Sequence, residues 1–205
     1  MKKIFIFVAI TIILSSCNSN DDKTITTADP LPAATQTGAN TFGCIINGQV
    51  FYPRDGQSSL LFGGTKGLKF WGDHTLNQNL YNEIEVKNAK DGLPASDMII
   101  HLQGLHQSGA GNYSLKATNF QNSIDGLMQN YIYAKIYTTA SGNWRYYGSY
   151  ENSGAVTITR YDFLNRICSG TFTGKLRIIN GTEEVEIQNG RFDLNWSTLS
   201  LKSFP

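Results

Sequence analysis

Residues 171–187, TFTGKLRIINGTEEVEI, decide the fold, because they contain two strand-like runs and the turn between them. In the first run, apolar residues stand at even positions (Phe172, Leu176 and Ile178) and polar residues at odd ones. Alternation with a period of two is typical of a half-buried antiparallel strand. Asn180-Gly181 predicts a type I′ hairpin turn, since both residue types tolerate a positive φ.

The same signals recur along most of the chain. Apolar and polar residues alternate in 80–87 and in 98–103, and Asn47-Gly48 predicts a second type I′ hairpin. Residues 41–205 therefore predict one all-β domain, either an antiparallel up-and-down barrel or a two-sheet sandwich. We expect about ten strands, with a short additional one at 112–115: 43–46, 49–52, 68–71, 80–88, 98–104, 130–138, 144–151, 155–161, 168–179 and 183–196.

The last of these strands contains a conflict of register. Val185 and Ile187 occupy odd positions, whereas Phe192, Leu194 and Trp196 occupy even ones. A regular strand cannot keep both sets on one face, because a shift of one residue inverts the faces. The sequence therefore predicts a β-bulge or a break at Asn189-Gly190, with glycine taking the unusual backbone conformation.

The N-terminus carries an export signal. Lys2 and Lys3 precede an apolar run of about eleven residues, 4–14, which fits a signal peptide over residues 1–16 and is too short to span a membrane. Leu14-Ser15-Ser16-Cys17 resembles the lipobox of bacterial lipoproteins. That resemblance implies a mature chain that begins at Cys17, with a lipid on its thiol that anchors it to the membrane.

The segment after Cys17 predicts a tether. Residues 17–40 contain few large apolar side chains, so they bury too little surface to fold alone, and we expect a flexible link. The acidic run at 18–22 resembles the signal that exposes lipoproteins at the cell surface in Bacteroidetes. Removal of Lys2 and Lys3 from 17 basic residues leaves 15 against 16 acidic ones, a net charge of −1, which gives no indication of nucleic-acid binding.

Several motifs together resemble one family. FGCIINGQVFYP at 42–53, GNYSL at 111–115, CSGTFTGKL at 168–176 and NGRFDLNW at 189–196 are similar to an uncharacterised family of small lipoproteins of the Bacteroidetes. The resemblance implies a β-rich protein anchored in the outer membrane. It implies no activity, no cofactor and no catalytic residue.

The sequence shows no recognised catalytic motif. His74, His101 and His106 lack metal-binding spacing, and neither GxSxG nor SxxK occurs. Carboxylates at 183, 184 and 186 could serve a glycoside hydrolase, but their alternation with Val185 and Ile187 places them on a solvated face. We therefore expect no catalytic residue, no metal and no cofactor.

Aromatic residues are the candidate ligand-binding group. If 130–138 and 144–151 pair as a hairpin, their aromatic side chains form a ladder on one face, and flat rings with polar edges suit sugar faces. The alternative is that these rings pack the interior or cover the sheet. The candidates are Tyr131, Tyr133, Tyr137, Trp144, Tyr146 and Tyr150.

Two cysteines remain after lipidation. Cys44 and Cys168 form an even pair in an oxidising compartment, and a disulfide between them would stabilise the fold by up to roughly 4–5 kcal/mol. The alternative is two free thiols in the core.

The sequence is consistent with three functions. The first is a non-enzymatic binding module for a glycan or an envelope protein, anchored in the outer membrane at the cell surface. The others are a glycan hydrolase with dispersed carboxylates and a purely structural component of an envelope assembly.

The lipid anchor gives the first testable prediction. Cys17→Ala removes the thiol that accepts the lipid, so the variant should leave the detergent phase in a phase-separation assay. Ser16→Ala keeps a small residue before the cysteine and should partition like the parent chain. A Cys17→Ala variant that stays in the detergent phase would contradict the lipobox interpretation.

Overall fold

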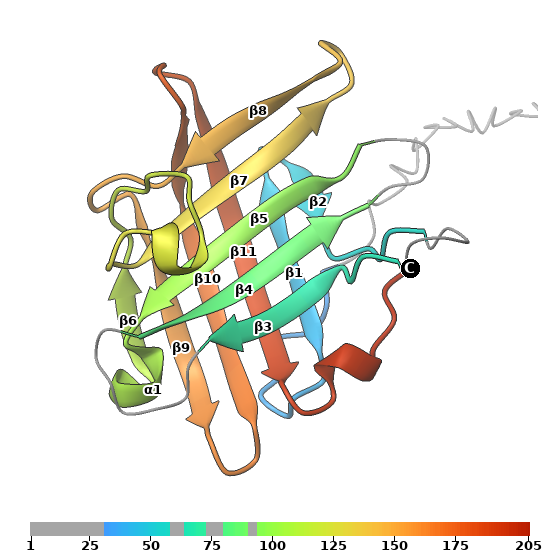
Figure 1. The fold of residues 1–205 in the computed structure, drawn as a ribbon, viewed down its shortest axis with the longest axis vertical. Coiled ribbons are helices and arrows are strands. Elements are labelled where there is room, and N and C mark those ends of the chain that lie inside the picture. Colours follow the sequence, from blue (N-terminus) through green and yellow to red (C-terminus); the bar gives the residue numbers. More distant parts are fainter. Residues whose placement is uncertain (1–30, 58–63, 73–79, 90–93) are drawn as a thin grey trace, which may run out of the picture.

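The alternating segments form one curled antiparallel sheet in a computed structural model, which describes residues 31–57, 64–72, 80–89 and 94–205 (Figure 1). The all-β prediction is confirmed. Its described elements, in chain order, are β1 (Thr41–Ile46), β2 (Gln49–Phe51), β3 (Leu68–Gly72), β4 (Tyr81–Asn88), β5 (Ser96–Gln103), α1 (Leu105–Ser108), β6 (Gly111–Ser114), η1 (Ser123–Asp125), β7 (Tyr131–Thr138), β8 (Asn143–Gly148), β9 (Gly154–Asp162), β10 (Ile167–Ile178), β11 (Glu184–Asn195) and η2 (Leu199–Leu201).

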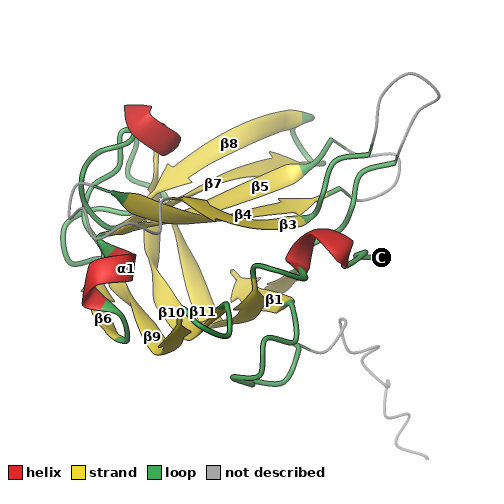
Figure 2. Cartoon of the chain, turned by 60° about the horizontal axis from the view of Figure 1, so that its bottom comes forward, coloured by secondary structure: helices red, strands yellow, loops and turns green. Residues whose placement is uncertain are grey.

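The sheet curls into a half-barrel. Its order is β2-β1-β11-β10-β8-β7-β5-β4-β3, with β9 paired to β10 and β6 paired to β9. Strand β10 is the branch point, because most of it pairs with β9 whereas Arg177 and Ile178 pair with β8. Figure 2 shows the result as two layers, with β8, β7, β5, β4 and β3 crossing over β9, β10, β11 and β1.

The concave side of the sheet holds the hydrophobic core. The open side lies between β2 and β3, where η2 packs against β3 and Phe204 exchanges backbone and side-chain hydrogen bonds with Asp55. Arg54, just after β2, forms a parallel bridge to Asn88 at the end of β4. The largest side chains that are almost completely buried include Phe42, Leu68, Ile84, Met98, Ile100, Leu102, Leu105, Leu115, Ile132, Ile158 and Phe172.

The predicted strands are found with small shifts at their ends, and one of the two predicted turns is confirmed. Asn47 and Gly48 have φ of 47° and 78°, as a type I′ turn requires. The prediction for Asn180-Gly181 is wrong, because only Asn180 has a positive φ. There the loop is longer, and the N–H of Ile178 donates to the carbonyl of Glu183 across it.

The predicted bulge in β11 is confirmed. On the β10 side, Phe172 pairs with Gly190 and Gly174 pairs with Ile187, so two residues of β11 oppose one of β10. The pairing with β1 shifts at the same place, between Gly43 and Ile45. Asn189, at φ 53°, takes the left-handed conformation that we expected of the glycine.

Of the two alternatives for the cysteines, the structure has the free thiols and not the disulfide. Cys44 and Cys168 are buried free thiols, and burial raises the pKa of both. Cys44 lies in β1 beside the bulge, whereas Cys168 lies in β10 opposite Leu194, with β11 between them. Two strand spacings amount to about 10 Å, beyond the roughly 7 Å that a disulfide allows between Cα atoms.

The last ten residues of the predicted tether, 31–40, lie against the sheet, because Asp193 holds them. Its Oδ2 accepts hydrogen bonds from the Thr35 hydroxyl at 2.6 Å and from the N–H groups of Thr37 and Ala39. Its Oδ1 accepts from the Gly38 N–H at 2.8 Å. The tether prediction is therefore corrected for 31–40, while residues 1–30, including Cys17, lie outside the described part of the chain.

Within the described ranges, the helices are too short and too polar to cross a bilayer.

The bulge can be tested with two neighbouring substitutions. A Cβ on Gly190 would lie 2.5 Å from the carbonyl oxygen of Phe172, so Gly190→Ala should lower the free energy of unfolding by about 2 kcal/mol. Asn189→Gly suits the left-handed backbone and should change it by less than about 0.5 kcal/mol. Urea denaturation measures both, and equal effects would contradict the bulge.

Asp193 predicts a pH dependence of stability. Burial raises its pKa, but the hydrogen bonds from Thr35, Ser169, Ala39 and Gly38 outweigh this and lower the pKa to about 2. A lowered carboxyl pKa stabilises the fold at pH values above the unfolded pKa, and this stability is lost as the pH falls through the folded pKa. Relative to Asp193→Asn, the parent chain should lose about 2 kcal/mol of unfolding free energy between pH 6 and pH 2.

Urea denaturation across this pH range measures the effect, with Asp125→Asn at an exposed carboxylate as control. Parallel pH profiles for the parent chain and Asp193→Asn would contradict the role of Asp193.

Candidate functional site

The predicted hairpin of aromatic residues forms from β7 and β8. Tyr137 pairs with Trp144 and Lys135 pairs with Tyr146. The rings of Tyr137 and Trp144 meet edge to face with centroids 5.7 Å apart, and the ammonium of Lys135 lies 4.3 Å from the Trp144 ring. Both contacts lie on the outer face of the sheet, since Ile132 and Ala134 point into the core.

Four of these side chains remain accessible and form what we call the aromatic platform: Lys135, Tyr137, Trp144 and Tyr146. Trp144 is 42% exposed and Tyr146 is 39% exposed. The indole N–H of Trp144 donates to the carbonyl of Ala95 at 3.2 Å. This hydrogen bond holds the indole ring of Trp144 in one orientation.

Two other candidates contact residues 115–130. Tyr131 is completely buried, and its hydroxyl donates to the carbonyl of Gln121 at 2.9 Å. Tyr133 is half-buried, with the ring of Phe120 6.3 Å away. Burial raises the pKa of Tyr131 and raises that of Tyr133 to about 12. The segment 115–130, which joins β6 to β7, covers this end of the ladder.

Tyr150 lies beyond the end of β8, so it does not belong to the ladder. The guanidinium of Arg177 lies 4.1 Å from the centre of its ring and also pairs with Glu184 at 2.9 Å. Tyr150 lines two neighbouring depressions on the outer face of the sheet.

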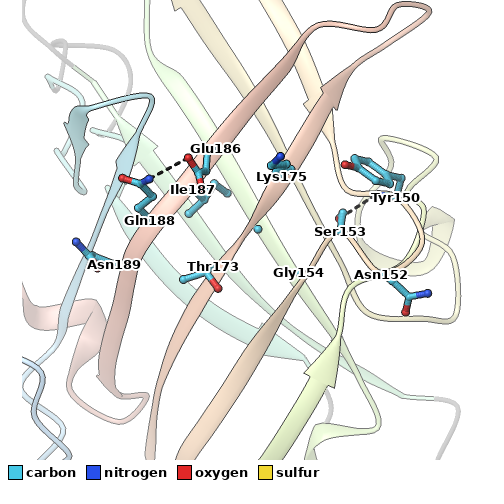
Figure 3. Close-up of a pocket in the computed structure, with 11 residues that line it drawn as sticks. Tyr150, Asn152, Ser153, Gly154, Thr173, Lys175, Glu186, Ile187, Gln188 and Asn189 are labelled. Carbon is cyan, nitrogen blue, oxygen red and sulfur yellow. Dashed lines mark hydrogen bonds between the residues drawn. The ribbon is translucent and has the colours of Figure 1, made fainter.

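The first depression, of about 630 Å³, lies where β9 begins, beside β10 and β11 (Figure 3). Gly154 pairs with Gly174 there, and a Cβ on Gly154 would lie 2.2 Å from the carbonyl oxygen of Thr173. Close approach of the two backbones leaves this part of the surface without side chains. We call this depression the polar groove, and its lining side chains include Tyr150, Asn152, Ser153, Thr173, Lys175, Glu186, Gln188 and Asn189.

The second depression, of about 580 Å³, lies between the polar groove and the β7–β8 hairpin. It lies between residues 117–120 and the β10–β11 turn, and it shares Tyr150 with the groove. On its far side, the N–H of Ile179 donates to the carbonyl of Tyr146. The outer face therefore carries accessible binding groups from the β7–β8 hairpin as far as β11.

A buried polar pair was missed by the sequence analysis. Glu83 and His101, both placed on outward-facing positions, are 0% and 1% exposed, and Nδ1 of His101 lies 2.7 Å from Oε1 of Glu83. The imidazole is stacked between Tyr81 and Tyr131, with ring centroids 4.8 and 4.4 Å away.

The same pair holds the 115–130 segment on the sheet. Oε1 of Glu83 also accepts from the N–H of Ser123 at 2.8 Å, and Ser123 has a left-handed φ of 57°. Within the described residues, Oε2 of Glu83 has no hydrogen-bond partner. No motif signals such a pair, because 83 and 101 meet only when β4 and β5 pair and the segment covers them.

The carboxylates and histidines considered for catalysis or metal binding do not lie together. Glu183 pairs with Arg145 and accepts from the Tyr147 hydroxyl, while Oε2 of Glu186 accepts from Gln188. His106 contacts the hydroxyl of Tyr161, and His74 lies outside the described residues. Across the described ranges, no three His, Cys, Asp or Glu side chains cluster in a way that could hold a metal ion.

No family model, no curated protein and no solved structure matches the chain.

Proposed function

We propose that the protein is a lipoprotein anchored in the outer membrane at the cell surface, and that its β domain is a non-enzymatic binding module. The lipobox-like sequence that ends at Cys17 and the acidic residues after it support the location. The domain binds its ligand, a glycan of the envelope or its surroundings, through the aromatic platform.

The exposure of Trp144 and Tyr146 carries this proposal. Both rings lie on a regular strand beside Lys135, on a face that water reaches. Tryptophan and tyrosine supply much of the binding energy at interfaces, because a rigid ring buries a large area at a small entropic cost. Their flat faces and polar edges match a sugar ring, which has apolar C–H faces and a rim of hydroxyl groups.

The carboxylates support binding rather than hydrolysis. A glycoside hydrolase uses two carboxyl groups that face each other across the bond to be cleaved. Glu183 and Glu184 instead engage Arg145 and Arg177. The hydrogen bond from the Tyr147 hydroxyl, followed by Arg145, lowers the pKa of Glu183, and Arg177 lowers the pKa of Glu184. A lowered pKa does not suit a general acid.

A glycan array tests the proposal with the unlipidated chain from Asn18 onward. The parent chain should bind a subset of glycans, and Trp144→Ala should weaken that binding by about tenfold, because the largest exposed ring is lost. Phe163→Ala, at a ring 36% exposed on the β9–β10 turn, should bind like the parent chain. Equal loss in both variants, or none in Trp144→Ala, would contradict the role of the platform.

A further inference from the structure

The polar groove carries hydrogen-bonding groups of a kind that the aromatic platform lacks. Asn152, Gln188 and Asn189 each present an amide, which has both a donor and an acceptor, and Ser153 and Thr173 add hydroxyl groups (Figure 3). The groups come from three successive elements, which are the turn before β9, strand β10 and strand β11.

Part of this set is held in position by the protein itself. The amide of Gln188 donates to Glu186 at 2.9 Å, and the hydroxyl of Ser153 accepts from the N–H of Tyr150 at 3.1 Å. Gln188 therefore keeps its carbonyl oxygen for a ligand, while Ser153 keeps its O–H. Such fixed groups lose little conformational entropy on binding.

The charges of the groove are balanced. Lys175 pairs in register with Glu186 across β10 and β11, and at the edge Arg177 pairs with Glu184. Opposite charges that face each other at this range largely cancel their outward field. The groove therefore has no electrostatic preference for a phosphate backbone or an anionic lipid surface, both of which are bound through an excess of Lys and Arg.

The shape of the groove favours an extended ligand. It spans the start of β9, strand β10 and strand β11, about 10 Å or two strand spacings, which is wider than a single sugar ring. The ring of Tyr150 lines one side of the groove. The paired glycines Gly154 and Gly174 have no side chains, so they form its floor. Open, shallow and polar surfaces suit chains that keep many of their own contacts with water.

We propose that the polar groove is a second binding site, for an uncharged, hydroxyl-rich chain of the neutral oligosaccharide class. Neighbouring hydroxyl groups of a sugar donate and accept in pairs, as the amides of Asn152 and Gln188 do. The inference rests on the proposed binding function and extends it, because the platform stacks on ring faces whereas the groove recognises hydroxyl groups. Tyr150 lines both the groove and the second depression, which lies between the groove and the β7–β8 hairpin.

Nuclear magnetic resonance on the ¹⁵N-labelled chain from Asn18 onward tests the assignment. The probes are neutral hexasaccharides of glucose, mannose, galactose or xylose, with hexagalacturonate as the anionic comparison. At least one neutral probe should shift the side-chain amide signals of Gln188 and Asn152. Gln188→Ala should weaken its binding about fivefold, because a fixed amide is lost.

Two matched variants separate the sites. Asn112→Ala removes an exposed amide from β6, outside the groove, and should bind within about twofold of the parent chain. Trp144→Ala should leave the shifts of the groove amides detectable. Shifts confined to the Trp144 indole and the β7–β8 hairpin would overturn the groove assignment and leave the proposed function standing.

Three other outcomes decide the remaining points. Stronger shifts in the groove with hexagalacturonate than with every neutral probe would overturn the neutral ligand class. Undiminished binding by Gln188→Ala would overturn the role of the groove amides. The absence of shifts at both sites with every probe would overturn the groove assignment together with glycan binding by the platform.

Discussion

The extra residue at Asn189 is the constraint on which the half-barrel depends. Strand β11 lies inside the sheet and pairs with β1 on one side and β10 on the other, so both neighbours must agree with it. Its first half turns odd positions to the core and its second half even ones. A single bulge in β11 corrects both registers at once, so that Ile187 and Phe192 lie on the same concave face. Without it, half of the strand would present polar side chains to the core.

The curled sheet also has an outer, convex face, and the protein covers that face unevenly. Where the 115–130 segment lies on it, Glu83 and His101 are removed from water and anchor Ser123. A buried pair of this kind contributes little net stability, because desolvation offsets the attraction, but it favours one arrangement of the segment. The cover reaches only the end of the β7–β8 hairpin that contains Tyr131 and Tyr133, and Trp144 and Tyr146 stay exposed beyond it.

The proposed binding surface combines two kinds of recognition along one face. Rings on β7 and β8 offer apolar area, whereas amides and hydroxyl groups around β10 offer directional hydrogen bonds. Lys175 and Glu186 balance each other, so contact with a ligand depends on shape and hydrogen bonding more than on net charge. An extended chain that meets both sites would gain from their connection, since binding at one raises the effective concentration at the other.

The sequence alone determined what depends on near neighbours in the chain. Alternation located the strands, Asn47-Gly48 specified its turn, and the parity change between Ile187 and Phe192 located the bulge. Only the tertiary structure decided which outward residues are buried: Glu83 and Tyr131 have the same alternation as exposed residues, and a distant segment covers them. It also separated Cys44 from Cys168 and assembled the polar groove from β11 and the turn before β9. Alternation assigns a side chain to one face of its own strand, whereas long-range packing decides what lies over that face.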